Sequence, residues 1–201
     1  MSFSLLDGKG SGKEAGVDSR NRVLSASLSD TESNYHTTLG LKFNINTGDI
    51  PITNDDELTV LYFKNNDNRA VVIDALIYNL GNSTGGAGDL TINVVRNPVS
   101  GDIITNALAP EVGQGVEANL NYGSTNTLNA DVFKGAQGDV LITGGNVNVL
   151  TRKTSPGTVP ISPGGGVILP KGSSIAFNYK PQTGNTSQIV QFAFNTYVKE
   201  F

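Results

Sequence analysis

The 201-residue sequence has no cysteine and no tryptophan, and its single histidine is His36. The absence of cysteine excludes disulfides, thiolate zinc sites and cysteine nucleophiles. With one histidine, a histidine-rich metal site is impossible, and a Ser-His-Asp triad would have to use His36 as its base. We therefore expect no metal, no other cofactor and no enzymatic activity.

Charge and long apolar runs are also scarce. Charged residues make up 16% of the chain, the net charge is −4 and the pI is about 4.9, which argues against binding of nucleic acid or anionic lipid through bulk electrostatics. No apolar run is long enough to span a membrane. The first residues, MSFSLLDGKG, lack the charged and apolar regions of a signal peptide. We expect a protein that matures in a cytoplasm, without a nucleic-acid or membrane partner.

The stretch DGKGSGKEAG, residues 7–16, has the glycine and lysine content of a phosphate-binding loop but not its spacing. Its glycines are Gly8, Gly10 and Gly12, and Lys13 is followed by Glu14, which has no hydroxyl for magnesium. Only SFSLL precedes it, which is too short for a buried parallel strand. The stretch is more typical of an extended segment near the N-terminus.

Residues 1–38 as a whole are polar and glycine-rich, with a few small apolar islands. Such a segment cannot form its own core, so we predict an extended arm held by a neighbouring subunit or a larger assembly. An arm folded back on its own domain is the alternative. The residues expected to contact a capsid or subunit are Leu5, Leu6, Val17, Val23, Leu24 and Leu28.

Residues 39–201 predict an all-β body. Strong helix formers are sparse, glycine is abundant at 24 residues, and no window carries a clean helical stripe. Residues 70–81 could pass for a helix, but the β-branched run Val71–Ile73 favours a strand. The spacing of strands and turns is typical of a β-sandwich, and the long closing hairpin suits a jelly roll. Strands are expected at 40–46, 49–54, 58–66, 70–81, 90–95, 102–104, 127–135, 145–153, 167–169, 174–179 and 190–198.

No motif in the body points to catalysis. His36 lies at the junction of arm and body, a poor place to preorganise a site, so we expect a surface or interface histidine. The clusters NDDE (54–57) and NNDNR (65–69) do not fit a calcium loop and are expected to be surface turns. A glycosidase would need two carboxylates in a cleft, and nothing singles out a pair.

Several segments of the sequence resemble a known protein family. These are the segment from residue 7 to 40, KFNINTGDIPIT, LYFKNNDNRAVVIDALI, VVRNP and ILPKGSSIAFNY. Together they resemble tailed-bacteriophage virion proteins, in particular small head-decoration (cement) proteins. The resemblance implies a β-sandwich module, usually trimeric, that binds the major capsid protein on the outer capsid surface after assembly in the host cytoplasm. It carries no active-site motif.

Two other functions stay open at this point. A receptor- or glycan-binding virion appendage, such as a head fibre or tail component, fits the same fold. A carbohydrate-active enzyme fits less well.

The closing and central strands predict a subunit interface. Residues 58–64 are apolar on both faces, and Tyr197 lies on the face opposite Phe192 and Phe194. Exposed apolar surface of this kind usually marks an interface, and a threefold axis matches the local symmetry of icosahedral shells. We predict a homotrimer whose interface contains Phe63 and Tyr197.

Overall fold

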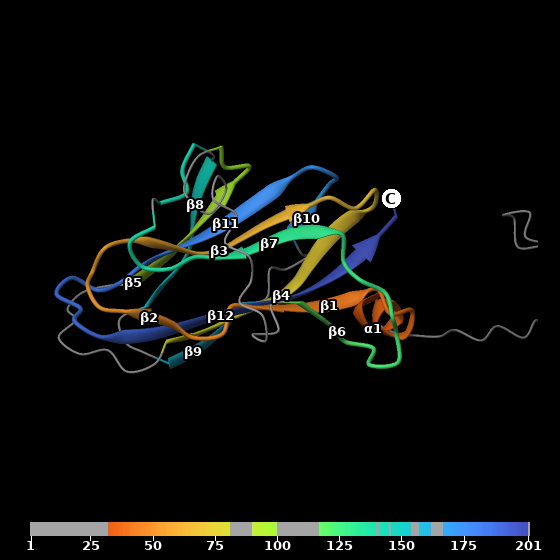
Figure 1. Cartoon of the computed structure of the whole chain (residues 1–201), viewed down its shortest axis with the longest axis horizontal. Coiled ribbons are helices and arrows are strands. Elements are labelled where there is room, and N and C mark those ends of the chain that lie inside the picture. Colours follow the sequence, from red (N-terminus) through yellow and green to blue (C-terminus); the bar gives the residue numbers. More distant parts are fainter. Residues whose placement is uncertain are drawn as a thin grey trace, which may run out of the picture. The chain divides into compact units, whose positions relative to one another are not determined.

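The computed structural model describes residues 32–80, 90–99, 117–139, 141–144, 146–153, 157–161 and 167–200. These residues form one short helix and two antiparallel β-sheets packed face to face, which confirms the predicted all-β sandwich (Figure 1). The elements are α1 (Glu32–Thr38), β1 (Lys42–Asn46), β2 (Ile50–Ile52), β3 (Leu58–Asn65), β4 (Ala70–Leu80), β5 (Leu90–Arg96), β6 (Glu117–Asn119), β7 (Ala130–Lys134), β8 (Asn146–Lys153), β9 (Gly157–Ile161), β10 (Val167–Leu169), β11 (Ser174–Lys180) and β12 (Gln188–Lys199).

The strands of the two sheets pair in a nested order. One sheet runs β10-β4-β12-β1-β6, with β2 added to β12 and β9 added to β4, and the other runs β7-β3-β11-β5-β8. In these sheets β1 pairs with β12, β3 with β11, β4 with β10 and β5 with β8. The first strand of the body therefore pairs with the last, and successive strands from the start of the body pair with successively earlier strands from its end. This is the arrangement of a jelly roll, in which one long antiparallel hairpin is rolled into two sheets.

The core lies between the sheets and is built on strand alternation. In β12, Val190, Phe192, Phe194 and Val198 are buried on one face, as the period of two predicts. Phe177 of β11 contacts Phe192 and Phe194 across the core, with ring centroids 4.4 and 6.0 Å apart. Burial of each such ring contributes about 1.5–3 kcal/mol.

Both apolar faces of strand β3 are covered within the protomer. Phe63 is fully buried between the sheets, where its ring meets Phe194 edge-on at 5.6 Å between centroids. The assignment of Phe63 to a trimer interface is therefore corrected, because its side chain has no surface to offer a partner. The pairing with β11 skips Val60, and this β-bulge lets both Val60 and Leu61 join the core.

The other face of β3 is covered by a distant part of the same chain. Thr59 Oγ1 donates to Asn178 Oδ1 (2.8 Å) and accepts from the Ile142 amide (3.0 Å), while Asn178 Nδ2 donates to the Ile142 carbonyl (3.1 Å). This closed set of buried hydrogen bonds holds the segment around Ile142 against the sheet. A second small apolar cluster lies there, made of Tyr62, Val95, Phe133, Ile142 and Ala176.

The body begins earlier than the sequence predicts. The chain divides into two units, Met1–Thr31 and Glu32–Phe201, so residues 32–38, expected in the arm, belong with the sandwich. The predicted arm contacts Leu5, Leu6, Val17, Val23, Leu24 and Leu28 lie outside the described residues, as does the predicted strand at 102–104. Strands β6 and β9 were not predicted.

Candidate functional site at helix α1

Helix α1 is the element through which residues 1–31 join the body. Glu32 lies in its first turn, where a carboxylate interacts favourably with the helix dipole. The helix ends in a Schellman motif, because the Leu41 amide donates to the His36 carbonyl (2.8 Å) and the Gly40 amide donates to the Thr37 carbonyl (3.0 Å). Gly40 has a φ of 66°, and a Cβ there would lie 2.2 Å from Ser124 Oγ. Only glycine suits both conditions.

The apolar side of α1 packs on β12 through an aromatic stack. His36 is 8% exposed and its ring lies nearly parallel to that of Tyr197, with centroids 4.6 Å apart. Tyr35 meets His36 edge-on at 5.6 Å. Tyr197 is 7% exposed beneath this helix, so its assignment to a trimer interface is also corrected. Of the expected surface or interface position of His36, the surface position is overturned by this burial.

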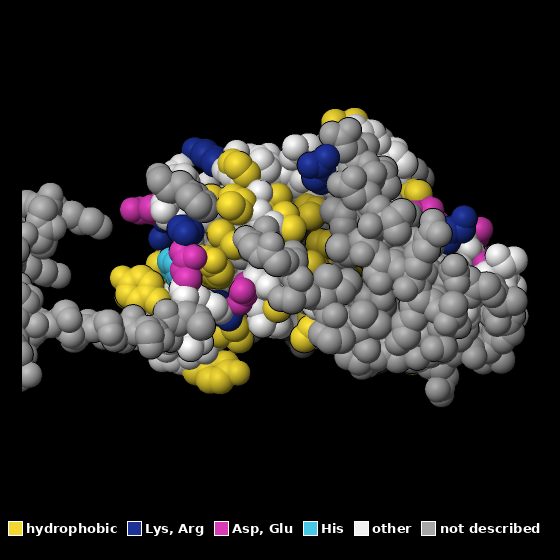
Figure 2. Space-filling model, turned by 180° about the vertical axis from the view of Figure 1, so that it is seen from behind, with side chains coloured by type: hydrophobic (Ala, Val, Ile, Leu, Met, Phe, Trp, Pro, Cys, Tyr) yellow, Lys and Arg dark blue, Asp and Glu magenta, His cyan; other side chains and the backbone are white. Residues whose placement is uncertain are grey.

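The polar side of α1 is tied to three strands. Ser33 Oγ donates to Asp74 Oδ2 of β4 (2.7 Å), and Lys42 Nζ of β1 donates both to Asp74 Oδ2 (3.2 Å) and to Ser33 Oγ. Lys199 Nζ of β12 contacts Glu32 Oε1 at 2.5 Å. We call this set the α1 cluster: Glu32, Ser33, His36, Lys42, Asp74, Tyr197 and Lys199. Figure 2 shows the histidine as a small cyan surface beside acidic, basic and hydrophobic side chains.

Burial and charge shift three pKa values in the α1 cluster. Desolvation lowers the pKa of His36 below its ordinary 6.5, Lys199 lowers it further, and Glu32 opposes the shift. The hydrogen bond from Lys199 lowers the pKa of Glu32 below 4.5. Burial, with the nearby carboxylates of Glu32 and Asp74, raises the pKa of Tyr197 above 10.0. Neutral His36 and Tyr197 and ionised Glu32 are thus the forms that suit this site at pH 7.

The α1 cluster does not have the arrangement of a catalytic site. Ser33 lies beside a lysine amine, but its hydroxyl donates to Asp74, and Lys42 is engaged in an ion pair with the same carboxylate. Lys42 is therefore not placed to take a proton from Ser33. Among the residues that the structure describes, no group of three or more histidine, aspartate and glutamate side chains could hold a metal ion. The arrangement instead fixes a helix to a sheet.

Two open grooves lie elsewhere on the body. The first, of about 690 Å³, is lined by the turn between β3 and β4, by β10 and by Glu200. Its basic groups are already engaged: Arg69 Nε contacts Asp67 Oδ1 at 3.0 Å, and Lys171 Nζ donates to Asn68 Oδ1 at 2.6 Å. The Arg69 guanidinium holds the pKa of Asp67 below its usual range. These contacts stabilise the NNDNR turn, as predicted.

The second groove, of about 490 Å³, lies between β2 and the segment after β7. Gln137 Oε1 bridges it by accepting from the amide and hydroxyl of Thr53 (2.5 and 3.0 Å). The adjacent NDDE segment is a surface turn as predicted. Its side chains bond to the backbone: Asn54 Oδ1 accepts from the Asp56 amide (3.0 Å) and Asp55 Oδ2 accepts from the Gly184 amide (2.8 Å).

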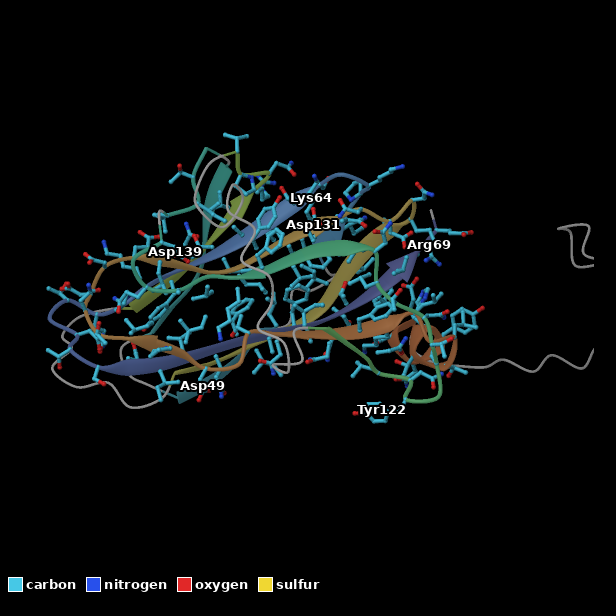
Figure 3. The ribbon with its side chains drawn as sticks, in the orientation of Figure 1. Asp49, Lys64, Arg69, Tyr122, Asp131 and Asp139 are labelled. Carbon is cyan, nitrogen blue, oxygen red and sulfur yellow. The ribbon has the colours of Figure 1, made fainter. Side chains whose placement is uncertain are left out.

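Among the described residues, six of the seven exposed large apolar side chains lie in two places, and the seventh, Val99 (73% exposed), follows β5. Near α1 are Tyr35 (56% exposed), Leu39 (46%) and Tyr122 (93%). The loop that carries Tyr122 is tied to the helix end, since Asn121 Nδ2 donates to the Thr38 carbonyl (3.0 Å), and Figure 3 shows the Tyr122 ring pointing away from the body. The second place is the outer face of the β10-β4-β12 sheet, where the exposed residues are Ile77, Ile168 and Ile189.

Comparison with protein-family models, curated proteins and solved structures found no match to this chain. The described helix has seven residues, and in the part of the chain that the structure describes no helix has the length and apolarity for a membrane crossing. Function must therefore be argued from the α1 cluster, the two apolar surfaces and the sequence itself.

Proposed function

We propose that this chain is a structural protein of a bacteriophage virion, a capsid decoration or cement protein. It binds the major capsid protein on the outer surface of the head, in a particle assembled in the host cytoplasm. The observation that carries the proposal is the anchoring of α1, which gives residues 1–31 a fixed starting point on a jelly-roll body. The resemblance of the sequence to head-decoration proteins supports it.

In this proposal the two units, Met1–Thr31 and Glu32–Phe201, have different roles. The glycine-rich segment 1–31 lies along the capsid, because glycine lets a backbone approach a partner surface closely. Its apolar residues Leu5, Leu6, Val17, Val23, Leu24 and Leu28 fill grooves or add a strand there. The body stabilises the shell from outside. It acts without a cofactor, an enzymatic activity, nucleic acid or a membrane.

The body is proposed to be a homotrimer, but its interface must differ from the one predicted from the sequence. Phe63 and Tyr197 are covered within the protomer. The outer face of the β10-β4-β12 sheet is the better candidate, because Ile77, Ile168 and Ile189 are each nearly half exposed there. All three lie on the face of this sheet that points away from the core.

Deletion of residues 1–28 tests the proposal, because it removes the apolar islands and retains α1. We expect a truncated protein with an unchanged far-UV spectrum and melting temperature that no longer co-sediments with capsids of the source phage stripped of this protein. Full attachment of the truncated protein would refute the role of the segment. A cryo-EM map of the intact particle gives the location: density must repeat over the whole shell.

A receptor- or glycan-binding appendage is the second candidate, and the exposure of Tyr122 favours it. A ring that is 93% exposed in an asparagine-rich loop resembles the platforms on which sugars stack. Glycan-array binding that Tyr122→Ala abolishes, together with density restricted to fibres or the tail, would support this function over capsid decoration. Tyr35→Ala is the matched control at a second exposed tyrosine.

A further inference from the structure

We propose that helix α1 is an acid-released latch: protonation of His36 detaches residues 32–38 from the sheet. This inference concerns the isolated chain and does not depend on what residues 1–31 bind. It follows from the position of His36, the charges around it and the shortness of the helix.

The position of His36 suits a neutral imidazole. The side chain is buried between α1 and β12, and within the part of the chain that the structure describes its Nδ1 has no hydrogen-bond partner. An imidazolium would have two N–H donors to satisfy. The nearest acidic atom, Glu32 Oε1, is 3.9 Å from Nε2, beyond hydrogen-bond distance. The stacked Tyr197 ring attracts a cation weakly, but it gives the buried Nδ1–H no acceptor.

The charged groups around His36 already balance one another. On α1 itself the titratable neighbours are Glu32 and Tyr35; β12 contributes Tyr197 and Lys199, while β1 and β4 contribute the pair Lys42 and Asp74. Two carboxylates thus face two ammonium groups, in the pairs Glu32–Lys199 and Asp74–Lys42. A proton on His36 would leave one uncompensated positive charge in the docked cluster.

The direction of the pH effect follows from linkage. Burial lowers the pKa of His36 in the docked helix, whereas an undocked, solvated His36 has the ordinary pKa of 6.5. The undocked form therefore binds the proton more readily, so docking is strongest above pH 6.5 and weakens as the pH falls below it. The docking constant falls on the order of tenfold per pH unit until the docked pKa is reached. Docking weakens for a separate reason below pH 4.5, because protonation of the Glu32 carboxylate removes its ion pair with Lys199.

The helix is short enough for this change to release it. A helix of seven residues is unstable alone in water, so α1 persists only through its contacts with the sheet. When these weaken, the helix unfolds as it leaves. Seven residues then add roughly 23 Å of extended chain to the N-terminal segment, and Tyr197 is uncovered.

An NMR titration of the full chain from pH 7.5 to 4.0 tests the proposal. The chain has one histidine, so the histidine Cε1–H signal reports His36 without ambiguity. We expect a midpoint below pH 6.5, and at the same midpoint a loss of the amide signals of Leu39 and Leu41, which mark the helix end. A His36 midpoint at or above 6.5 would overturn the latch, as would amide signals that stay unchanged through the titration.

His36→Phe is the matched control, because phenylalanine keeps a ring on Tyr197 and cannot be protonated. We expect its Leu39 and Leu41 amide signals to remain those of the docked helix down to pH 5.0. If the variant released α1 at the same pH as the wild type, another group would be responsible and the proposal would fail. Should the variant not fold, the wild-type titration decides the question alone. Release confined to pH below 4.5 would assign the effect to Glu32 and also overturn the proposal.

Discussion

Gly40→Ala should destabilise the body more than the same change at Gly138 or Gly172, which also have positive φ. A left-handed backbone costs a non-glycine residue about 1–2 kcal/mol. At Gly40 the added Cβ would also lie 2.2 Å from Ser124 Oγ and 2.5 Å from Ser124 Cβ. Relief of this contact moves Ser124, whose hydroxyl accepts from the Asn126 amide at 3.1 Å. Overpacking of this kind costs about 1–3 kcal/mol, so we expect a total loss of about 2–5 kcal/mol.

Gly172→Ala and Gly138→Ala separate the two costs. Gly172 has a φ of 78° and Gly138 a φ of 97°, and a Cβ at either would meet nothing within 4 Å. These variants should lose only the backbone cost of about 1–2 kcal/mol. For a domain of this size each kcal/mol lowers the melting temperature by about 2–4 °C, so thermal or urea unfolding resolves the difference.

The double variant Gly40→Ala, Ser124→Gly completes the test. Removal of the serine side chain opens the space that the new Cβ needs, so the double variant should lose less than the two single changes combined. Two results would refute the reasoning. One is a Gly40→Ala variant no less stable than Gly172→Ala. The other is strict additivity of the Gly40 and Ser124 changes.

Three further predictions follow from the fold and its surfaces. Phe63→Ala should cost about 3–5 kcal/mol in urea unfolding, because it leaves a cavity in the core, and should not change the oligomeric mass; a folded, fully stable variant of lower mass would restore Phe63 to an interface. Thr59→Val should cost about 1–3 kcal/mol, since it leaves the Ile142 amide and one contact of Asn178 unsatisfied; an unchanged urea midpoint would show that these bonds do not hold the segment. Ile77→Asp should lower the mass seen by light scattering from trimer to monomer while the far-UV spectrum stays β-rich, and a wild-type monomer at micromolar concentration would refute the trimer.

Alternation made most of the strands predictable. Val190, Phe192 and Phe194 in β12 and Ile175, Phe177 and Tyr179 in β11 follow the period of two that a sheet with one core-facing side requires. Strand β6 was not predicted because its three residues are too few to show a period. Strand β9 was not predicted because the glycine and proline in residues 157–161 are typical of a turn.

Helix α1 and the burial of β3 were missed for different reasons. ESNYHTT contains few strong helix formers, so its helix depends on docking, although Glu32 and Gly40 mark its ends as a short helix would. The apolar outer face of β3 suggested a partner, but Ile142, about 80 residues further along the chain, covers it. The hydrophobic pattern of a strand indicates that a face is apolar, but it does not indicate which distant segment covers that face.

The nested pairing also determines when the body can fold. Strand β1 finds its main partner in β12, the last strand of the chain, and β12 also pairs with β2 and β4. Contacts of such long sequence separation form slowly, because a large loop must close before any is made. During synthesis, therefore, residues 1–31 leave the ribosome well before the sheet that α1 needs exists. A ribosome that stops before residue 188 therefore releases a chain that lacks β12 and has no closed sandwich.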